Sequence, residues 1–319
     1  MTNTNISSRL RALGLAISAM VALGVLADTA SAQLYVANPG SDSVGEYDAV
    51  TGAAINTSFI TGLSGPIGLA VSGTDLFVAN SNTGTIGEYD AGTGATIDAA
   101  FIGGLSGPQT LALSGSDLYV VNNTNGTIGE YDATSGAAIN TALVTGLSAP
   151  IGVAVSGTDL YVSNNTTGTI GRYNATTGAV VDAAFVASLG SPSGIAEAAG
   201  NLYVTSSGVG DGTNSVSVYD ASSGAAISAP LITGLHNPSG ITVSGQNLFV
   251  VNFNSNSVGV YDGTSGSVVS TSFVSGLDEP WGIVVVGASI PEPATYTILG
   301  GLAVLGLAQV RRRTGGSKR

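Results

Sequence analysis

Three short phrases return six times along the chain at almost constant spacing. The first phrase has the form L-[YF]-V-x-[NS] and begins at leucines that are 42 residues apart, with one step of 46; these are Leu34, Leu76, Leu118, Leu160, Leu202 and Leu248. The second is a tyrosine, usually followed by aspartate, at positions 47, 89, 131, 173, 219 and 261. The third is a proline at 66, 108, 150, 192, 238 and 280, which opens P-x-G in all but one copy. Repeats of this length that carry several short strands are typical of β-propeller blades.

One repeat unit, from Pro66 to Gly107, shows how a blade is encoded. β-branched and aromatic runs alternate with clusters of Gly, Asn, Asp and Ser, which predicts three strands at 67–71, 76–79 and 85–89. A weaker fourth strand is expected at 95–102, anchored by Ile97 and Phe101. No segment has the length and the 3.6-residue period of a helix. Because strands that are apolar on both faces require cover on both faces, the blades must pack against one another.

The two ends of the repeat region favour a closed ring over an open stack. The first copy begins at Leu34 without a preceding P-x-G strand, and the last copy is followed by a spare first strand at 280–286. That spare strand can complete the N-terminal blade and so remove exposed sheet edges. An open stack would need polar caps, which the sequence does not show. We therefore predict an all-β, six-bladed propeller over residues 33–288, closed by its C-terminal strand.

The repeat phrases also resemble a known family. D-L-Y-V-x-N, then T-[IV]-G-x-Y-[DN], then P-x-G-[ILV]-A-V is similar to the YVTN β-propeller repeats and their NHL relatives, over roughly residues 33–287. The resemblance implies a type of blade. It does not imply an activity, because propellers host many unrelated functions.

Residues 1–32 have the pattern of a secretory signal peptide. Arg9 and Arg11 supply the positive charge, residues 12–26 the apolar run, and Ala30 and Ala32 the small residues of a cleavage site. An N-terminal membrane anchor is the alternative. It is less favoured because the apolar run is short and a cleavage motif follows it.

The segment 289–319 combines three features in a fixed order: a P-E-P motif, an apolar run at 294–310, and an arginine cluster. The motif residues are Pro291, Glu292, Pro293, Arg311, Arg312 and Arg313. The apolar run is near the ~17-residue lower limit for a transmembrane helix, and the arginines would hold the C-terminus on the cytoplasmic side. The order resembles the PEP-CTERM sorting signal of Gram-negative bacteria.

That resemblance implies an exported protein that is anchored transiently in the inner membrane. It further implies cleavage by an exosortase, a final place at the cell surface or outside the cell, and an association with exopolysaccharide production. The alternative is an ordinary single-span anchor, which has the same topology without cleavage.

The charge of the repeat region restricts its partners. Of the 20 acidic residues, Asp28 and Glu292 lie in the terminal segments, which leaves 18 against the single basic residue Arg172, or about −17. Such a charge repels nucleic acids and anionic membrane surfaces. Charged residues make up only 9% of the chain, and turns rich in Ser, Thr, Asn and Gly would suit carbohydrate-rich surroundings or a passive scaffold. Cysteine is absent from the sequence, which excludes thiol catalysis.

Several polar residues recur with the repeat. Glu46, Glu88 and Glu130 precede the tyrosine in three copies, and we expect them to be solvated. A structural role in turns is expected for the residues that follow the tyrosine: Asp48, Asp90, Asp132, Asn174, Asp220 and Asp262. The asparagine that ends L-Y-V-x-N is expected to cap a strand end or turn. Weak calcium binding by these loops would use their oxygen ligands, but the spacing of a calcium loop is missing, so no cofactor is predicted.

Departures from the repeat define a candidate ligand site. The P-x-G residues should surround one mouth of the central channel. Most copies have only small or aliphatic residues there, apart from Gln109. The last two copies bring the only histidine and the only tryptophan of the chain, with two carboxylates: His236, Asp278, Glu279 and Trp281. The hypothesis is a stacking platform at Trp281 beside a polar or metal-binding group. Simple drift of the terminal copies is the alternative. Copy five also has four extra residues, which fall within 206–215.

Two classes of function remain open. One is a non-enzymatic exported propeller, a surface or matrix scaffold whose partners are an exosortase, the secretion machinery, and an exopolysaccharide or surface protein. The other is a metal-dependent propeller lyase, lactonase or hydrolase. One histidine, one arginine and no G-x-S-x-G elbow leave few groups for catalysis. The scaffold is therefore favoured, with no catalytic residue and no resident metal predicted.

Overall fold

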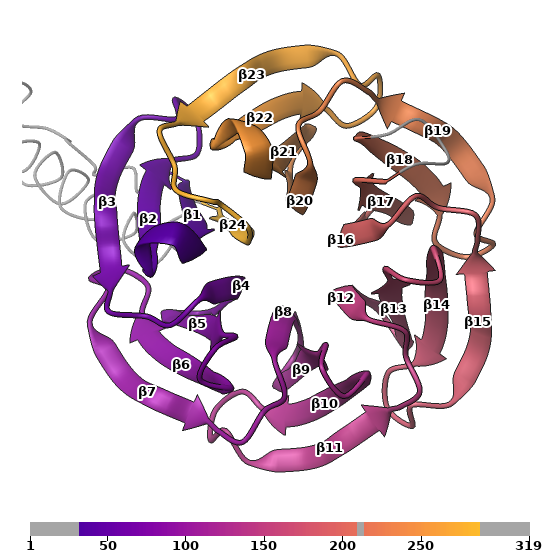
Figure 1. Ribbon diagram of the computed structural model, residues 1–319, viewed down its shortest axis with the longest axis horizontal. Coiled ribbons are helices and arrows are strands. Elements are labelled where there is room, and N and C mark those ends of the chain that lie inside the picture. Colours follow the sequence, from indigo (N-terminus) through magenta and orange to yellow (C-terminus); the bar gives the residue numbers. More distant parts are fainter. Residues whose placement is uncertain (1–31, 209–213, 288–319) are drawn as a thin grey trace, which may run out of the picture. The chain divides into compact units, whose positions relative to one another are not determined.

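Six four-stranded antiparallel sheets form the blades of a propeller, each with its first strand innermost and its fourth outermost (Figure 1). The computed structural model describes residues 32–208 and 214–287. The predicted cleavage residue Ala30, the sorting motif and the predicted membrane span at 294–310 lie outside these residues. No helix within the described residues has the length and apolar character needed to cross a membrane.

The blades follow one another along the chain, apart from the first, which joins both ends of the ring. The first blade contains β24 (Ile283–Val286), β1 (Gln33–Asn38), β2 (Ser43–Asp48) and β3 (Ala54–Thr61). The second contains β4 (Pro66–Ser72), β5 (Asp75–Asn80), β6 (Thr85–Asp90) and β7 (Thr96–Ile102). The third contains β8 (Pro108–Ser114), β9 (Asp117–Asn122), β10 (Thr127–Asp132) and β11 (Ala138–Val144).

The remaining blades repeat the same order. The fourth contains β12 (Pro150–Ser156), β13 (Asp159–Asn164), β14 (Thr169–Asn174) and β15 (Val180–Val186). The fifth contains β16 (Pro192–Ala198), β17 (Asn201–Ser206), β18 (Ser215–Asp220) and β19 (Ala226–Ile232), so the extra residues of copy five lie between its second and third strands. The sixth contains β20 (Pro238–Ser244), β21 (Asn247–Asn252), β22 (Ser257–Asp262) and β23 (Val268–Ser275). Short 3-10 helices, η1 (Pro39–Ser41) and η2 (Phe253–Ser255), follow β1 and β21.

The ring is closed by the C-terminal strand, as the spare strand in the sequence predicted. β24 pairs antiparallel with β1, with Gln33 opposite Val286 and Val36 opposite Ile283. Two further backbone bonds extend the pairing: Trp281 N donates to Ala37 O (3.0 Å), and Ala37 N donates to Gly282 O (2.9 Å). Closure therefore rests on contacts between the two ends of the described chain.

The core lies between the blades, because the second and third strands are buried on both faces. In β5, Leu76, Phe77 and Val78 are fully buried. Leu76 and Val78 pack toward the first blade, whereas Phe77 packs with Leu118 of the third. Alternate side chains thus enter the two neighbouring interfaces, which follows from the two-residue period of a strand. Because each blade supplies half of two cores, a single repeat cannot fold alone.

The fourth strands form the exposed circumference of the ring. Each is bulged against the third strand. In the second blade, for example, Ile86 pairs with Ile102 and Glu88 with Asp98, so an advance of two residues along β6 corresponds to four residues along β7. Such bulges twist an edge strand away from further pairing. Ile97 is 53% exposed, so the prediction that it anchors this strand was wrong. Phe101 does anchor it, with its ring centroid 5.4 Å from that of Phe77.

The recurring aspartates and asparagines hold turns and linkers, as predicted. Asp90 Oδ1 accepts bonds from Gly92 N (3.1 Å), Thr93 N (2.8 Å) and Thr93 Oγ1 (2.7 Å), which lower the pKa of the carboxyl group. The equivalent bonds lower the pKa of Asp220 to about 2. At the strand end, buried Asn80 accepts a bond from Ser64 N (3.1 Å) and so fixes the linker that enters β4.

The three repeated glutamates are buried, so the prediction that they are solvated was wrong. Glu46, Glu88 and Glu130 are 4%, 9% and 6% exposed. They lie on third strands, which neighbouring blades cover on both faces, and burial raises the pKa of each carboxyl group. Glu46 accepts a hydrogen bond from Gln33 Nε2 (2.7 Å). Arg172 takes the same place in the fourth blade and pairs with Asp159 at 2.7 Å.

Candidate functional site

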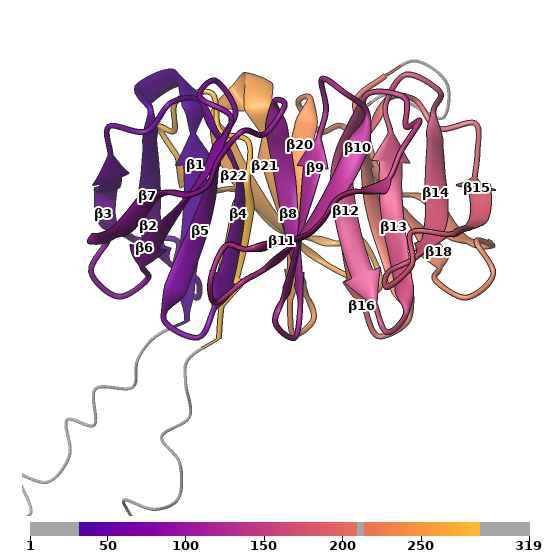
Figure 2. The ribbon, with the colours of Figure 1, turned by 90° about the horizontal axis from the view of Figure 1, so that it is seen from below.

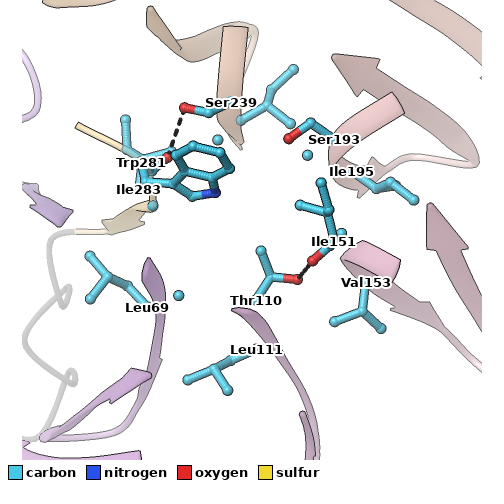
Figure 3. Close-up of a pocket in the computed structure, with 16 residues that line it drawn as sticks. Leu69, Thr110, Leu111, Ile151, Val153, Ser193, Ile195, Ser239, Trp281 and Ile283 are labelled. Atoms are coloured by element: carbon cyan, nitrogen blue, oxygen red, sulfur yellow. Dashed lines mark hydrogen bonds between the residues drawn. The ribbon is translucent and has the colours of Figure 1, made fainter. Parts of the chain in front are cut away.

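The P-x-G residues surround the central channel. They line a cavity of about 70 Å³ to which all six first strands contribute (Figure 3). We call the six residues at the third position of P-x-G, or at the equivalent position where the glycine is replaced, the collar: Gly68, Thr110, Gly152, Gly194, Gly240 and Gly282. The cavity has room for a few water molecules and is much smaller than the ~300–1,000 Å³ of typical small-molecule sites.

Glycine is required in the collar because the backbones of adjacent blades touch there. A Cβ atom on Gly240 would lie 2.3 Å from Trp281 O, and one on Gly282 would lie 1.9 Å from Ile67 O. The Gly240 N–H also donates to Trp281 O (3.0 Å). Thr110 is the exception, and its hydroxyl donates to Ile151 O (Figure 3). The repeated glycine therefore allows the backbones of adjacent blades to pack closely, a role that the sequence pattern alone did not reveal.

Buried hydroxyl groups near the collar are also structural. Ser163 Oγ accepts a bond from Gly152 N (2.7 Å) and donates to Ser193 O (2.6 Å). Thr205 Oγ1 bridges Gly194 N and Ser239 O, at 2.8 Å each. These hydroxyls connect adjacent blades, so their hydrogen-bonding capacity serves the ring itself.

Trp281 is placed on the channel, where its indole ring lies over the cavity (Figure 3). It makes an edge-to-face contact with Phe253, with ring centroids 5.6 Å apart and planes at 77°. Phe253 was not singled out from the sequence, although it follows L-F-V-V-N where the first copy has proline and the other four have serine or asparagine. Both rings are available as an apolar platform at this part of the rim.

The other predicted site residues do not lie together in one site. Gln109 is partly buried and donates from Nε2 to Ser81 Oγ (3.4 Å). His236 and Glu279 are exposed in loops that precede first strands. Asp278 is exposed as well, but it lines a groove on the ring's circumference rather than the channel cavity. Across residues 32–208 and 214–287, no three His, Cys, Asp or Glu side chains lie close enough to hold a metal ion, so these residues do not form a set of metal ligands.

Two grooves lie between outer strands of adjacent blades. The β7–β11 groove has a volume of about 500 Å³ and runs between the end of β7 with its following linker and β11; its walls include Phe101, Gly104, Asn122, Asn125, Tyr131 and Thr141. The β23–β3 groove has a volume of about 280 Å³ and lies at the interface of the sixth and first blades; its walls include Asn38, Tyr47, Thr57, Phe273, Gly276 and Asp278. The two occupy equivalent positions in the repeat.

Residues with aliphatic side chains predominate at the end of the channel away from the collar. A cavity of about 370 Å³ there is lined mainly by aliphatic residues of the first strands, among them Leu69, Leu111, Ile195 and Ile241, with Glu197 as its one acidic residue. The inner strands run between the two faces of the ring (Figure 2). The channel therefore has a narrow glycine collar toward one face and a wider cavity, lined mainly by aliphatic residues, toward the other.

One match among solved structures agrees with a propeller fold. The chain is similar to one in a crystal structure of a nidogen/laminin complex, with a TM-score of 0.68 and 19% identity over 80% of this chain and 98% of that chain. A computationally designed protein, Ika8, is matched with a TM-score of 0.46 and 17% identity, over 79% of this chain and 77% of that one. No known family profile and no curated protein matches the chain. The protein is a six-bladed β-propeller, and at these identities the likeness concerns the fold alone.

Proposed function

We propose that the protein is an exported, non-enzymatic propeller that acts as a binding scaffold at the cell surface or in the extracellular matrix. The observation that carries this proposal is the glycine collar, which narrows the channel to about 70 Å³ between tightly packed backbones. The collar itself leaves little room for a substrate, and the wider end of the channel, about 370 Å³, is lined mainly by aliphatic residues with a single carboxylate, Glu197. The faces and circumference of the ring are left as the surfaces for binding.

Export and sorting are proposed from the terminal sequences. Residues 1–32 have the pattern of a signal peptide, and 289–319 resemble a PEP-CTERM signal that an exosortase would cleave. The paired ends of the ring are compatible with this, because Gln33 lies opposite Val286 in the first blade. Attachment through the C-terminal segment would then hold the ring at the face where β24 ends.

The surface chemistry supports an uncharged polar partner, either an exopolysaccharide or a surface protein. The repeat region carries about −17, so polyanions are disfavoured. At the channel rim, we propose Trp281 as a stacking platform, with His236, Glu279 and Gln109 as polar neighbours on the same side of the blades. Loss of binding in Trp281→Ala and His236→Ala would support this assignment, and unchanged binding in both would refute it.

The experiment that tests export and sorting is mass spectrometry of the protein from its native host, with and without the sorting protease. We expect an N-terminus at Gln33 in both samples, and a C-terminus near residues 291–293 only when the protease is present. A chain that retains Arg311 to Arg313 in both samples would refute sorting and indicate a simple anchor. Metal analysis of the same protein addresses the enzymatic alternative, because a stoichiometric, tightly held ion would favour a metal-dependent lyase or hydrolase.

A further inference from the structure

The β7–β11 groove combines an apolar floor with uncharged polar walls. Ile102 and Tyr131 close its floor but are only 4% exposed, so the accessible apolar surface comes mainly from the partly buried ring of Phe101. Its walls carry the amide of Asn125 and the hydroxyl of Thr141, whereas the Asn122 amide is buried and accepts a bond from Ser106 N (3.2 Å). The volume of about 500 Å³ lies within the range of small-molecule sites. The groove thus offers both a surface for C–H groups and partners for hydrogen bonds.

Some of the polar groups in the groove are free to bind a ligand. Asn125 Oδ1 accepts a bond from Thr127 Oγ1 (2.9 Å), and the Asn125 amide N–H groups have no hydrogen-bond partner among residues 32–208 and 214–287. The exposed Thr141 hydroxyl has no hydrogen-bond partner within the described part of the chain. A hydroxyl can donate and accept, and an amide side chain supplies both a donor and an acceptor. A ligand that is rich in hydroxyl groups can use all of them.

The chemistry of the lining selects among ligand classes. The β7–β11 groove has no charged side chain in its lining, so it provides no counter-charge for an ionic ligand. A purely apolar ligand would bury the amides and hydroxyls without partners, which costs free energy. A neutral sugar ring has apolar C–H faces and a hydroxyl edge, and therefore matches both parts of the groove. We infer that the interblade grooves bind neutral sugar units of a polysaccharide.

The second groove repeats the same arrangement. In the β23–β3 groove, Tyr47, Asn38, Thr57 and Phe273 replace Tyr131, Asn122, Thr141 and Phe101. It differs in being smaller, about 280 Å³, and in carrying the Asp278 carboxylate, which can accept bonds from sugar hydroxyls. A polymer with repeated sugar units can engage both grooves, and linked binding events raise the overall affinity. This inference rests on the proposed surface scaffold and names the ligand class and its sites.

The test uses the natively processed protein and neutral oligosaccharides, namely glucose, galactose and mannose hexamers, with a uronic-acid hexamer as the charged comparison. Thr141→Trp fills the β7–β11 groove, and Thr57→Trp fills the β23–β3 groove. The matched controls are Ile139→Trp and Ile55→Trp, which place the same side chain at exposed positions of the same strands, outside the grooves. Titration calorimetry and native mass spectrometry measure the affinity and the number of bound oligosaccharides.

We expect at least one neutral hexamer to bind at more than one site per chain, with one site lost in each groove variant. Each single variant should bind a neutral polysaccharide roughly tenfold more weakly or worse, because linked binding is lost; the double variant, with both grooves filled, should lose binding, whereas both controls bind normally. Should Thr141→Trp fail to fold, Ala142→Trp obstructs the same wall.

Three results would overturn the inference: no neutral oligosaccharide binds, the double variant binds like the wild type, or the uronic-acid hexamer binds more tightly than every neutral one. Binding that is lost in Trp281→Ala but kept in the double variant would place the ligand at the channel rim. That result overturns the groove assignment and leaves the proposed scaffold intact. Failure of export or sorting is detected by a different experiment, the mass spectrometry that identifies the N-terminus and the C-terminus of the processed protein.

Discussion

The substitution Gly240→Ala tests whether the collar holds the ring together. The new Cβ would lie 2.3 Å from Trp281 O and 3.2 Å from Ile283 Cγ2. The two backbones would have to separate by about 0.7 Å merely to restore a 3.0 Å contact. This movement also weakens the bond from Gly240 N to Trp281 O, which is 3.0 Å long in the structure. The substitution therefore acts directly on the contact between the sixth blade and the closing segment.

The size of the effect follows from three contributions. Overpacking costs about 1–3 kcal/mol, and the weakened hydrogen bond adds about 1 kcal/mol. Replacing glycine lowers the entropy of the unfolded chain, which offsets about 0.4–1 kcal/mol. We expect a net loss of about 1–3 kcal/mol in the free energy of unfolding, equivalent to a fall in Tm of roughly 2–12 °C for a domain of this size.

Urea denaturation and scanning calorimetry measure this loss, with Gly103→Ala as the matched control. A Cβ on Gly103 would meet no atom within 4 Å, and its φ is not in the left-handed region, so the control should stay within about 0.5 kcal/mol of the wild type. Equal stability of Gly240→Ala and the wild type would refute the reasoning, since the collar would then tolerate a side chain where the backbones of two blades touch.

Three further predictions concern the buried polar groups. Because burial raises the pKa values of Glu46, Glu88 and Glu130 above 4.5, the folded state binds protons more readily than the unfolded state, and Tm should rise as the pH falls from 7 toward 4.5. Thermal melts of the triple Glu→Gln variant should show a flatter profile, and an unchanged slope would contradict this origin. Arg172→Gln removes the pair with Asp159 (2.7 Å) and the contact with the Phe185 ring (5.3 Å), and we expect a loss of about 1 kcal/mol in urea denaturation that shrinks at high salt; a loss independent of salt would point to packing instead. Asn122→Ala leaves Ser106 N without its acceptor, which should cost about 1–3 kcal/mol in the same assay, and a neutral result would show that the linker is held by other contacts.

The blades could be predicted from the sequence because their determinants are local. Turn residues such as Asp90 and Gly94 end the strands, and the apolar runs between them have the length of buried strands. Closure was also predictable, because one first strand was left over at 280–286. The six-fold recurrence made each of these signals visible several times.

The burial of the repeated glutamates was not predictable from residue type. Glu88 is covered because its strand, β6, lies in a blade that packs between two others. The apolar character of both strand faces already implied such cover, but a carboxylate at that position suggested solvent. Burial set by blade packing therefore prevailed over the usual preference of glutamate for the surface.

The candidate site was predicted in part. Trp281 lies on the channel as expected, yet Asp278, three residues earlier, lines the β23–β3 groove. Between them the chain turns at Glu279, whose φ of 51° is in the left-handed region. Neighbouring positions in the sequence are thereby directed to different surfaces. The grooves were missed because each is built from two blades, and their residues look like ordinary turn and strand residues in any single repeat.

Closure of the ring by β24 is tested most directly by a cross-link between its two ends. The chain has no cysteine, so the double variant Gln33→Cys, Val286→Cys places the only two thiols at positions that lie opposite each other in β1 and β24. Under mild oxidation of the folded protein, mass spectrometry should find the peptides that contain residues 33 and 286 joined within one chain, and neither single variant should form this product. A folded double variant that forms no such bond, or forms it only between chains, would contradict the closed six-bladed ring.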